Sequence, residues 1–470
     1  MEKIALQYVS TRGEAPELDF SDTLLAGLAT DGGLYVPKTW PEFSKREIKA
    51  LRGKPYADVA FTILQPFVDG DIPDDQLKKM IDEAYAGFRH NAVTPIIQMD
   101  DNSYLLELFH GPTLAFKDVA MQLLGRMMDY VLEQRDQRAT IVGATSGDTG
   151  GAAIEAFANR DRTDLFILFP HNRVSPVQQR QMTTSKAKNV HSIAIEGTFD
   201  DCQNLVKAMF NHSDFRQDVQ LSGVNSINWG RIMAQIVYYF TASLAIGGPD
   251  RKVSFTVPTG NFGDIFAGYA AKKMGLPIAK LTIASNDNDI LVRTLKTGTY
   301  EMKSVSATSS PSMDIQISSN FERLLFEAYG RDGVKIRNAM DALKQSGSFT
   351  IEDDILKAIR REFTTGKALG KNVDATILKY HQENGYLLDP HTAVGMYVAE
   401  KNIRPTAPMI TLATAHPAKF PTAVKTACGI DPALPNWLSD LMQREETFRV
   451  LPAELKFVEE FISMHTRASL

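Results

Sequence analysis

One lysine lies where a helix is expected to begin. The segment HGPTLAFKDVAMQLLGRMMDYVLEQR (110–135) carries apolar residues at helical spacing, and Thr113 is the expected N-cap. Lys117 therefore falls in or near the first turn, where the helix dipole disfavours a positive charge. The dipole also lowers the pKa of an amine, as a lysine that attacks an aldehyde requires. A solvated lysine balanced by Asp118 is the alternative, and this segment alone favours that alternative.

A second segment, PTGNFGD (258–264), joins an apolar run to an expected helix. Gly260 and Gly263 allow the backbone to approach an anion closely, and a helix that begins near Asp264 presents free N–H groups to it. The segment lacks the Gly-Lys-Ser/Thr ending of a P-loop and is not G-x-G-x-x-G, which argues against a P-loop kinase and a dinucleotide-binding dehydrogenase. It indicates phosphate binding, with a plain tight turn as an equal alternative.

A third segment, GATSGDTGG (143–151), has the same strand–loop–helix context. Its backbone amides and the hydroxyls of Thr145, Ser146 and Thr149 suit a carboxylate or another oxyanion. Asp148 does not fit a pure anion site, so it either caps the helix or accepts a hydrogen bond from a ligand's ammonium or hydroxyl group. One nest for a cofactor phosphate, one for a substrate carboxylate and an amine for an aldehyde together make a complete pyridoxal 5'-phosphate (PLP) site.

The bulk composition excludes several other classes of function. The chain has 470 residues, which predicts two to four domains, and a net charge of -5 with no block of Lys or Arg argues against nucleic acid as a partner. Cys202 and Cys428 form no C-x-x-C pair and the histidines are scattered, so neither a disulfide framework nor a metal site is expected. No apolar run could span a bilayer and the N-terminus shows no targeting pattern, so a cytoplasmic protein is expected.

Three strand–loop–helix units position these residues. The apolar runs ATIVGA (139–144), VSFTV (253–257) and PMITLATA (408–415) each precede a loop and a helix, which indicates an α/β fold with helices on both faces of its sheets. A serine-rich loop at 303–320 is either a linker or a segment ordered by its neighbours.

The expected organisation follows from these units. We predict two open twisted sheet domains preceded by a mainly helical extension. The predicted parts are an N-terminal helical region at 1–96, a large domain at 97–139 and 226–440 with a helical insertion at about 320–390, a small α/β domain at 140–225, and a C-terminal helical segment at 441–470.

Taken in order, the motifs resemble the PLP enzymes of the tryptophan-synthase β-subunit fold (fold type II). More narrowly, they resemble the long-chain threonine synthases of bacteria and fungi. The resemblance covers nearly the whole chain. It is carried by YVSTRG (8–13), DGGLYVP (31–37), HGPTLAFKD (110–118), GATSGDTG (143–150), PTGNFGD (258–264), SPSMDIQISSNFERLLF (310–326), DPHTAVG (389–395) and LATAHPAKF (412–420).

The resemblance implies roles for particular residues. Lys117 would carry the cofactor and act as a mobile general acid/base, and Thr414 would hydrogen-bond the pyridine nitrogen. The cofactor's phosphate would be held by the backbone amides of Gly260, Asn261, Phe262, Gly263 and Asp264. The substrate carboxylate would be held by Thr145, Ser146, Gly147, Asp148 and Thr149. The substrate phosphate would be held by Asn225, Ser226 and Arg231, of which Arg231 is the sound chemical choice because a guanidinium fork matches a phosphate. A helix-surface arginine is the alternative reading of Arg231.

The resemblance further implies a lyase that converts O-phospho-L-homoserine and water to L-threonine and phosphate, acting as a monomer or small homo-oligomer. Within the same fold, the competing functions are a serine/threonine dehydratase and an O-acetylserine sulfhydrylase, whose substrates carry no phosphate. A catalytically silent homologue that senses a phosphorylated amino acid is the competing non-enzyme, and the intact Lys117 motif weighs against it.

Overall fold

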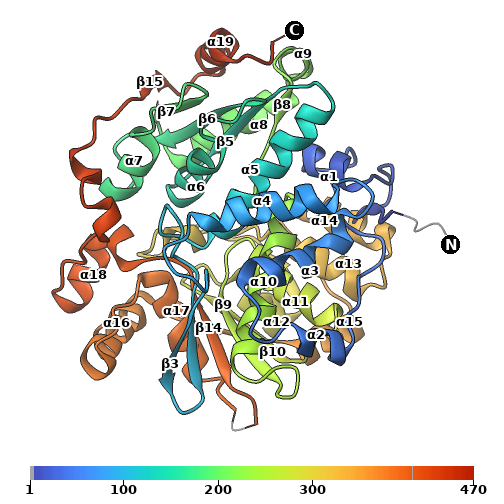
Figure 1. The fold of residues 1–470 in the computed structure, drawn as a ribbon, viewed down its shortest axis with the longest axis vertical. Helices are drawn as coiled ribbons and strands as arrows, with labels where there is room; N and C mark the ends of the chain where they lie inside the picture. Colours follow the sequence, from blue (N-terminus) through green and yellow to red (C-terminus); the bar gives the residue numbers. More distant parts are fainter. Residues whose placement is uncertain (1–4, 405, 470) are drawn as a thin grey trace.

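Two largely parallel β-sheets, each covered by helices on both faces, form the protein, which confirms the predicted α/β class (Figure 1). The structure is a computed structural model and describes residues 5–404 and 406–469. In Figure 1 the smaller sheet lies in the upper part of the molecule and the larger sheet in the lower part. The long helix α5 (Lys117–Gln134) lies between the two and packs on helices of both parts.

The larger sheet has six strands in the order β13-β10-β9-β14-β4-β3. All neighbours are parallel except β3 and β4, which are antiparallel. Its central strands β9 and β14 are buried along their whole length because helices cover both faces. The strands are β3 (Ile96–Asp100), β4 (Ser103–Glu107), β9 (Val253–Pro258), β10 (Ile278–Ser285), β13 (Phe363–Lys367) and β14 (Met409–Ala413).

Helices on opposite faces enclose this sheet. Helix α11 packs on one face with α10 behind it, and α17 packs on the other face with α16 behind it. The bounds are α10 (Trp229–Ala245), α11 (Gly263–Lys273), α16 (Gly370–Asn384) and α17 (Pro390–Glu400). The carboxyl ends of β4, β9 and β14 therefore meet at one edge of a buried parallel sheet, where ligands bind in open α/β folds.

The smaller sheet has five parallel strands in the order β15-β7-β6-β5-β8. Val142 and Phe166 face α8 and α19, whereas Ile141 and Leu165 belong to the core shared with α5 and α6. This alternation is the two-residue period of strands that are buried on both faces. The elements are β5 (Ala139–Ala144), β6 (Thr163–Pro170), β7 (Val190–Glu196), β8 (Leu221–Ser222), β15 (Arg449–Pro452), α6 (Asp148–Phe157), α8 (Phe199–Asn211) and α19 (Leu455–His465).

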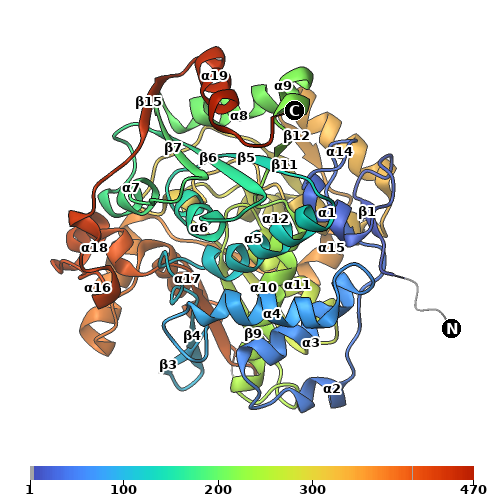
Figure 2. The same cartoon turned by 45° about the horizontal axis from the view of Figure 1, so that its top comes forward.

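The segment expected to be a helical C-terminus (441–470) also contains strand β15, which the sequence prediction missed. β15 is four residues long and pairs in parallel with β7, so the chain returns to the edge of the smaller sheet (Figure 2). Two of its residues are exposed, so its apolar pattern is too short to indicate a strand. Strands β12 (Ser348–Thr350) and β13 likewise interrupt the expected helical insertion.

The N-terminal region is mainly helical, and its helices α3 and α4 pack on α10 and α5. It also contains a two-stranded antiparallel sheet of β1 and β2, which apposes the YVSTRG and DGGLYVP motifs. The elements are β1 (Tyr8–Ser10), α1 (Phe20–Ala26), β2 (Tyr35–Pro37), α2 (Lys45–Ala50), α3 (Tyr56–Val68) and α4 (Asp74–Ala86).

The remaining elements surround the two sheets. They are α7 (Pro176–Thr183), α9 (Ser213–Asp218), α12 (Ile290–Thr297), β11 (Thr299–Glu301), η1 (Pro311–Met313), α13 (Phe321–Ala328), α14 (Gly333–Ser346), α15 (Asp353–Glu362), η2 (Pro417–Lys419), α18 (Pro421–Cys428), η3 (Asn436–Leu438) and η4 (Leu441–Gln443). Across the described part of the chain, no helix is both long enough and apolar enough to cross a membrane.

Candidate active site

The loop between β4 and α5 is built tightly around Asp118. Thr113 donates to that carboxylate twice, from its backbone amide at 2.8 Å and from its hydroxyl at 2.6 Å. Leu114 adopts a positive φ of 63°, a conformation that non-glycine residues rarely adopt, so the surrounding contacts must hold the turn in place. The expected N-cap is wrong: the helix begins at Lys117, and Phe116 precedes it without a side-chain cap. Thr113 instead binds the carboxylate of the first turn.

Lys117 is the first residue of α5 and is only 7% exposed. Its Nζ lies 3.5 Å from Asp148 Oδ2. Burial lowers the pKa of the Lys117 amine, and the positive charges of Arg231 and Lys419 act in the same direction, against the opposing effect of Asp148. The solvated-lysine interpretation is therefore wrong, and the carboxylate that the amine faces is that of Asp148, whereas the Asp118 carboxylate accepts from Thr113. A buried amine with a lowered pKa can act as a nucleophile.

The loop after β5 is organised by the Thr145 hydroxyl. Its oxygen accepts hydrogen bonds from the amides of Gly147 and Gly150, both at 2.9 Å. The side chains of Ser146 and Thr149 are half-buried and make no hydrogen bond to any residue that the structure describes, so both hydroxyls are free to bind a ligand. Gly147 has a φ of 138°, and a Cβ there would lie 2.4 Å from the Gln178 side chain.

Asp148 begins α6 and connects side chains from four other elements. Its Oδ1 accepts from Gln178 at 2.9 Å and lies 3.1 Å from Lys419 Nζ, and its Oδ2 faces Lys117 and, at 3.4 Å, the Ser312 hydroxyl. Burial by itself would raise the pKa of Asp148. The charges of Lys419 and Lys117 and the hydrogen bond from Gln178 together lower it by more, so the pKa lies well below its ordinary value and the carboxylate stays ionised. Asp148 does not cap the helix, and its described partners are protein groups, so its expected contact with a ligand's ammonium or hydroxyl group stays a prediction.

Lys419 is a residue that the sequence reasoning missed. It is completely buried and donates to the Thr113 carbonyl at 2.6 Å and to Gln181 Oε1 at 2.9 Å, besides its ion pair with Asp148. It thereby ties the loop before α5 to α6 and α7. The available signal was a lysine between alanine and phenylalanine, in the LATAHPAKF segment that contains the end of a buried strand and the turn after it. Gln178 and Ser312 gave no comparable signal.

The loop between β9 and α11 presents a row of free backbone amides. None of the amides of Gly260, Asn261, Phe262, Gly263 and Asp264 donates a hydrogen bond within residues 5–404 and 406–469. Phe262 adopts the left-handed conformation with φ 63°, and a Cβ on Gly260 would lie 2.8 Å from the Ser312 carbonyl oxygen. Unpaired amides at a helix N-terminus form an anion-binding nest.

The Asp264 side chain takes no part in that nest. Its Oδ1 accepts from the hydroxyls of Tyr238 and Tyr239, at 2.5 and 2.9 Å. Burial raises the pKa of Asp264 to about 6, against the effect of these two hydrogen bonds. Its carboxylate belongs to the α10–α11 interface, so only its backbone amide is available to a phosphate.

Thr414 follows β14 and lies next to the loop that carries Lys117. Its carbonyl accepts from the Phe116 amide at 2.9 Å, and its own amide donates to the Thr392 hydroxyl at 3.3 Å. Its buried side-chain hydroxyl has no partner in the part of the chain that the structure covers. The ends of β14 and of the β4–α5 loop are therefore joined directly.

Arg231 lies in the first turn of α10 and is 4% exposed, so the interpretation as a helix-surface arginine is wrong. Among the described residues its side chain makes one hydrogen bond, to the Val224 carbonyl at 3.3 Å, and its Nε is buried without a partner. Burial lowers the pKa of the Arg231 guanidinium to about 10. Ser226 is half-buried beside Gly263, whereas Asn225 is exposed. A buried guanidinium with unused donors is suited to an anion.

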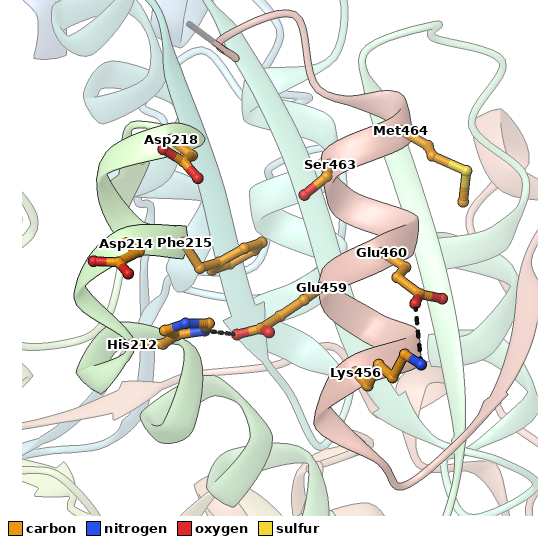
Figure 3. A pocket seen from close by; sticks show the side chains of 9 residues that line it. All are labelled: His212, Asp214, Phe215, Asp218, Lys456, Glu459, Glu460, Ser463 and Met464. Atoms are coloured by element: carbon orange, nitrogen blue, oxygen red, sulfur yellow. Dashed lines mark hydrogen bonds and ion pairs between the residues drawn. The ribbon is translucent and has the colours of Figure 1, made fainter.

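A separate groove lies between α9 and α19, away from these residues (Figure 3). His212 Nδ1 pairs with Glu459 at 2.8 Å across the groove. Lys456 pairs with Glu460 at 3.8 Å along α19. The lining residues are His212, Asp214, Phe215, Asp218, Lys456, Glu459, Glu460, Ser463 and Met464. None of the expected site residues is among them.

Comparisons with known proteins agree over the whole chain. The family profile described as "Threonine synthase N terminus" matches residues 7–85, "Pyridoxal-phosphate dependent enzyme" matches 88–414, and "Threonine synthase, C-terminal" matches 392–462. Threonine synthase from Pseudomonas aeruginosa is 53% identical, with 98% of each chain covered. Threonine synthase from Saccharomyces cerevisiae is 43% identical over 96% of this chain and 92% of the relative.

Solved structures give the same picture. The PLP-bound threonine synthase from Brucella melitensis has a TM-score of 0.97 and 66% identity, with 99% of this chain and 100% of that chain covered. Threonine synthase from Escherichia coli has a TM-score of 0.83 and 30% identity over 98% and 100% of the two chains. A threonine deaminase from Solanum lycopersicum, with a TM-score of 0.50 and 14% identity, shares the fold alone.

Proposed function

The chain belongs to the threonine synthase family of PLP-dependent enzymes, and we infer from this that it converts O-phospho-L-homoserine and water to L-threonine and inorganic phosphate. The convergence of three strand ends of the larger sheet carries the assignment of the site. There the buried amine of Lys117, the free hydroxyl of Thr414 and the five unpaired amides of 260–264 lie at one edge of the sheet.

These groups match the functional groups of PLP. The amide nest is suited to the cofactor's phosphate, and the amine of Lys117 is suited to its aldehyde. The hydroxyl of Thr414 is suited to the pyridine nitrogen, since a neutral partner there does not force protonation of the ring. When bound, PLP supplies the electron sink that stabilises negative charge on the substrate carbons.

The small-domain loop is proposed to hold the substrate carboxylate. The amides of Ser146, Asp148 and Thr149 and the hydroxyls of Ser146 and Thr149 have no acceptor in the described part of the chain. The Asp148 carboxylate cannot bind a second anion directly. We propose instead that it holds the Lys117 ammonium, while Thr145 and Gly147 shape the turn.

Lys117 is proposed to move the protons of the reaction. The freed amine would take one proton from Cα and one from Cβ, which lets phosphate leave Cγ, and would give one proton to Cγ. After water has added at Cβ, it would return one proton to Cα. A lowered pKa lets the amine release each proton, and Asp148 at 3.5 Å stabilises its charged form between steps.

Arg231 is proposed to bind the substrate phosphate and to stabilise it as it leaves Cγ. Its unused donors and the absence of an acidic neighbour among the described residues support this role. Ser226 is proposed to assist from the same loop, and Asn225, which is exposed, remains a prediction. Dehydratase and sulfhydrylase substrates have no phosphate to occupy this position.

A two-product assay tests the function. The purified full-length protein with PLP and O-phospho-L-homoserine should release phosphate and form threonine in equal amounts, and the Lys117→Ala variant should form both about 10³-fold more slowly. Release of phosphate without threonine would overturn the reaction assignment.

We also propose that the enzyme works in the cytoplasm as a monomer or small homo-oligomer. Both cysteines are free, as is usual in a reducing compartment. Cell fractionation and light scattering of the purified protein test these two proposals separately.

A further inference from the structure

The end of the serine-rich loop and the start of α13 pack against the amide nest. Ser318, Asn320 and Arg323 are 3%, 0% and 0% exposed. These residues belong to the ISSNFER segment (317–323), to which the proposed mechanism assigns no role. They lie on the side of the β9–α11 loop opposite to its unpaired amides, as the contacts below show.

Two carbonyls of the nest are held by this segment. The Gly260 carbonyl accepts from the Ser318 hydroxyl at 2.6 Å. The Asn261 carbonyl accepts from both the backbone amide and the side-chain amide of Asn320, at 3.0 and 2.9 Å. In a trans peptide the carbonyl and the following N–H point in opposite directions. Holding these two carbonyls therefore turns the amides of Asn261 and Phe262 away from Ser318 and Asn320, into the nest.

Asn320 also reaches the loop that precedes Arg231. Its side-chain amide donates to the Ser226 carbonyl at 3.2 Å, so one amide group bonds both loops. Its side-chain oxygen accepts from the Arg323 guanidinium, which fixes which end of the amide faces the loops. The orientation of Asn320 is therefore set by a fully buried partner.

Arg323 connects the same loops to the N-terminal sheet. Its guanidinium donates to the Tyr35 carbonyl from Nε at 3.1 Å and from a terminal nitrogen at 2.9 Å, and to the Ile227 carbonyl at 2.6 Å. The neighbouring Glu322 accepts from Thr11 and Arg12 of the YVSTRG motif. The N-terminal sheet thus supports both phosphate loops through α13.

We propose that Asn320 is a positioning residue that at the same time orients the amides of the 260–264 loop for the cofactor phosphate and the loop before α10, at 225–228, for the substrate phosphate. Ser318 positions the first loop alone. The inference rests on the proposed assignment of 260–264 to the cofactor phosphate.

The test compares PLP with pyridoxal, which carries the same aldehyde but no phosphate. Spectral titration of the full-length protein stripped of cofactor gives a dissociation constant for each. The wild type should bind PLP far more tightly than pyridoxal. Asn320→Ala and Ser318→Ala should each weaken PLP binding roughly tenfold and leave pyridoxal binding unchanged, because each frees a carbonyl that orients a phosphate-binding amide.

Arg331→Met is the matched control. Arg331 donates to the Pro37 and Lys38 carbonyls, so it supports the same N-terminal sheet without touching either loop. It should lower the melting temperature without changing the ratio of the PLP and pyridoxal constants. A merely structural role for Asn320 would give this same pattern and would overturn the proposal.

A second readout separates the two loops. Inorganic phosphate, the reaction product, should inhibit Asn320→Ala holoenzyme roughly tenfold less strongly than wild type, whereas Ser318→Ala should be inhibited as wild type is. Equal inhibition of wild type and Asn320→Ala would overturn the coupling. A wild type that bound pyridoxal as tightly as PLP would instead overturn the proposed function of the 260–264 loop.

Discussion

The start of α5 and the turn after β14 each bring a buried lysine to Asp148, yet the two lysines are held very differently. Lys419 has three oxygen partners between 2.6 and 3.1 Å, one for each of its donors. Among the described residues Lys117 has one oxygen partner, at 3.5 Å, and the Phe116 ring 4.7 Å away. Because a buried donor without a partner costs free energy, an ammonium left short of partners in a folded protein is expected to serve a ligand or a reaction. By this measure we propose a structural role for Lys419 and a functional role for Lys117.

Two buried arginines repeat the difference. Arg323 donates to Tyr35, Ile227 and Asn320, whereas Arg231 has a single bond of 3.3 Å and an unpaired Nε within the described chain. Neither guanidinium is paired with a carboxylate in the described chain. The comparison therefore predicts that removing an unsatisfied cation costs activity and spares stability, and that removing a satisfied one costs stability.

The largest expected effect belongs to Lys117. Lys117→Ala should lower turnover by about 10³-fold, because it removes both the cofactor's amine partner and the proton carrier. The melting temperature of the cofactor-free variant should not fall, because the substitution removes a buried charge that has only one weak oxygen partner to stabilise it. Steady-state assays and thermal unfolding check both parts. Normal turnover by the Lys117→Ala variant would contradict the proposed difference between Lys117 and Lys419.

Arg231 gives the next largest effect. Arg231→Gln should lower kcat/KM for O-phospho-L-homoserine by about 10²- to 10³-fold, since it removes donors to a leaving phosphate. Its melting temperature should stay at or above that of wild type, whereas Arg323→Gln should lower it. If both arginine variants lost stability equally, counting hydrogen bonds would not separate their roles.

Lys419 should show the opposite pattern to Lys117. Lys419→Met leaves Asp148 with a weaker set of cations and removes one of the two hydrogen bonds that the Thr113 carbonyl accepts, and it should cost about 3 kcal/mol of folding free energy. Lys425→Met is the control, because Lys425 forms an exposed pair with Asp431, and its loss should cost less than about 1 kcal/mol. Urea unfolding measures both. Equal midpoints for the two variants would contradict the structural role of Lys419.

The smallest effect is a pH dependence at Asp264. Burial raises the pKa of this carboxyl to about 6, above its ordinary value of 3.8, so the folded protein binds its proton more tightly than the unfolded chain does. Its contribution to stability is full below about pH 4 and is lost as the pH rises through about 6, at most about 3 kcal/mol. Asp264→Asn should remove that decline. The midpoints of urea unfolding at pH 4, 5, 6 and 7 check this. If the midpoint changed with pH equally in wild type and variant, the prediction would be contradicted.

The sequence allowed prediction of the residues that follow strands and missed those that reach the site from elsewhere. The 260–264 loop follows an apolar run and Thr414 lies at the end of another, so the strand–loop–helix pattern places both at one edge of a sheet. Lys117 was found from its place at the expected start of a helix. Lys419 and Asn320 act through contacts with residues more than 50 positions away, and no local pattern encodes such contacts.

The same physical reason explains why the pairing of β15 with β7 was missed. Strand β15 is short and half-exposed, and it pairs with β7, which lies more than 200 residues earlier in the sequence. Its conformation is therefore set by its partner strand. The α/β class was predictable because the central strands are long apolar runs, and such a run indicates a strand buried on both faces whichever strand it pairs with.

Chemical fixation of the cofactor tests the central claim most directly. Borohydride reduction of the holoenzyme links PLP permanently to the lysine that carries it, and peptide mass mapping then identifies that lysine. The account predicts the label on Lys117 and none on Lys419, although both are buried beside Asp148. A label on Lys419, or on any lysine other than Lys117, would contradict it.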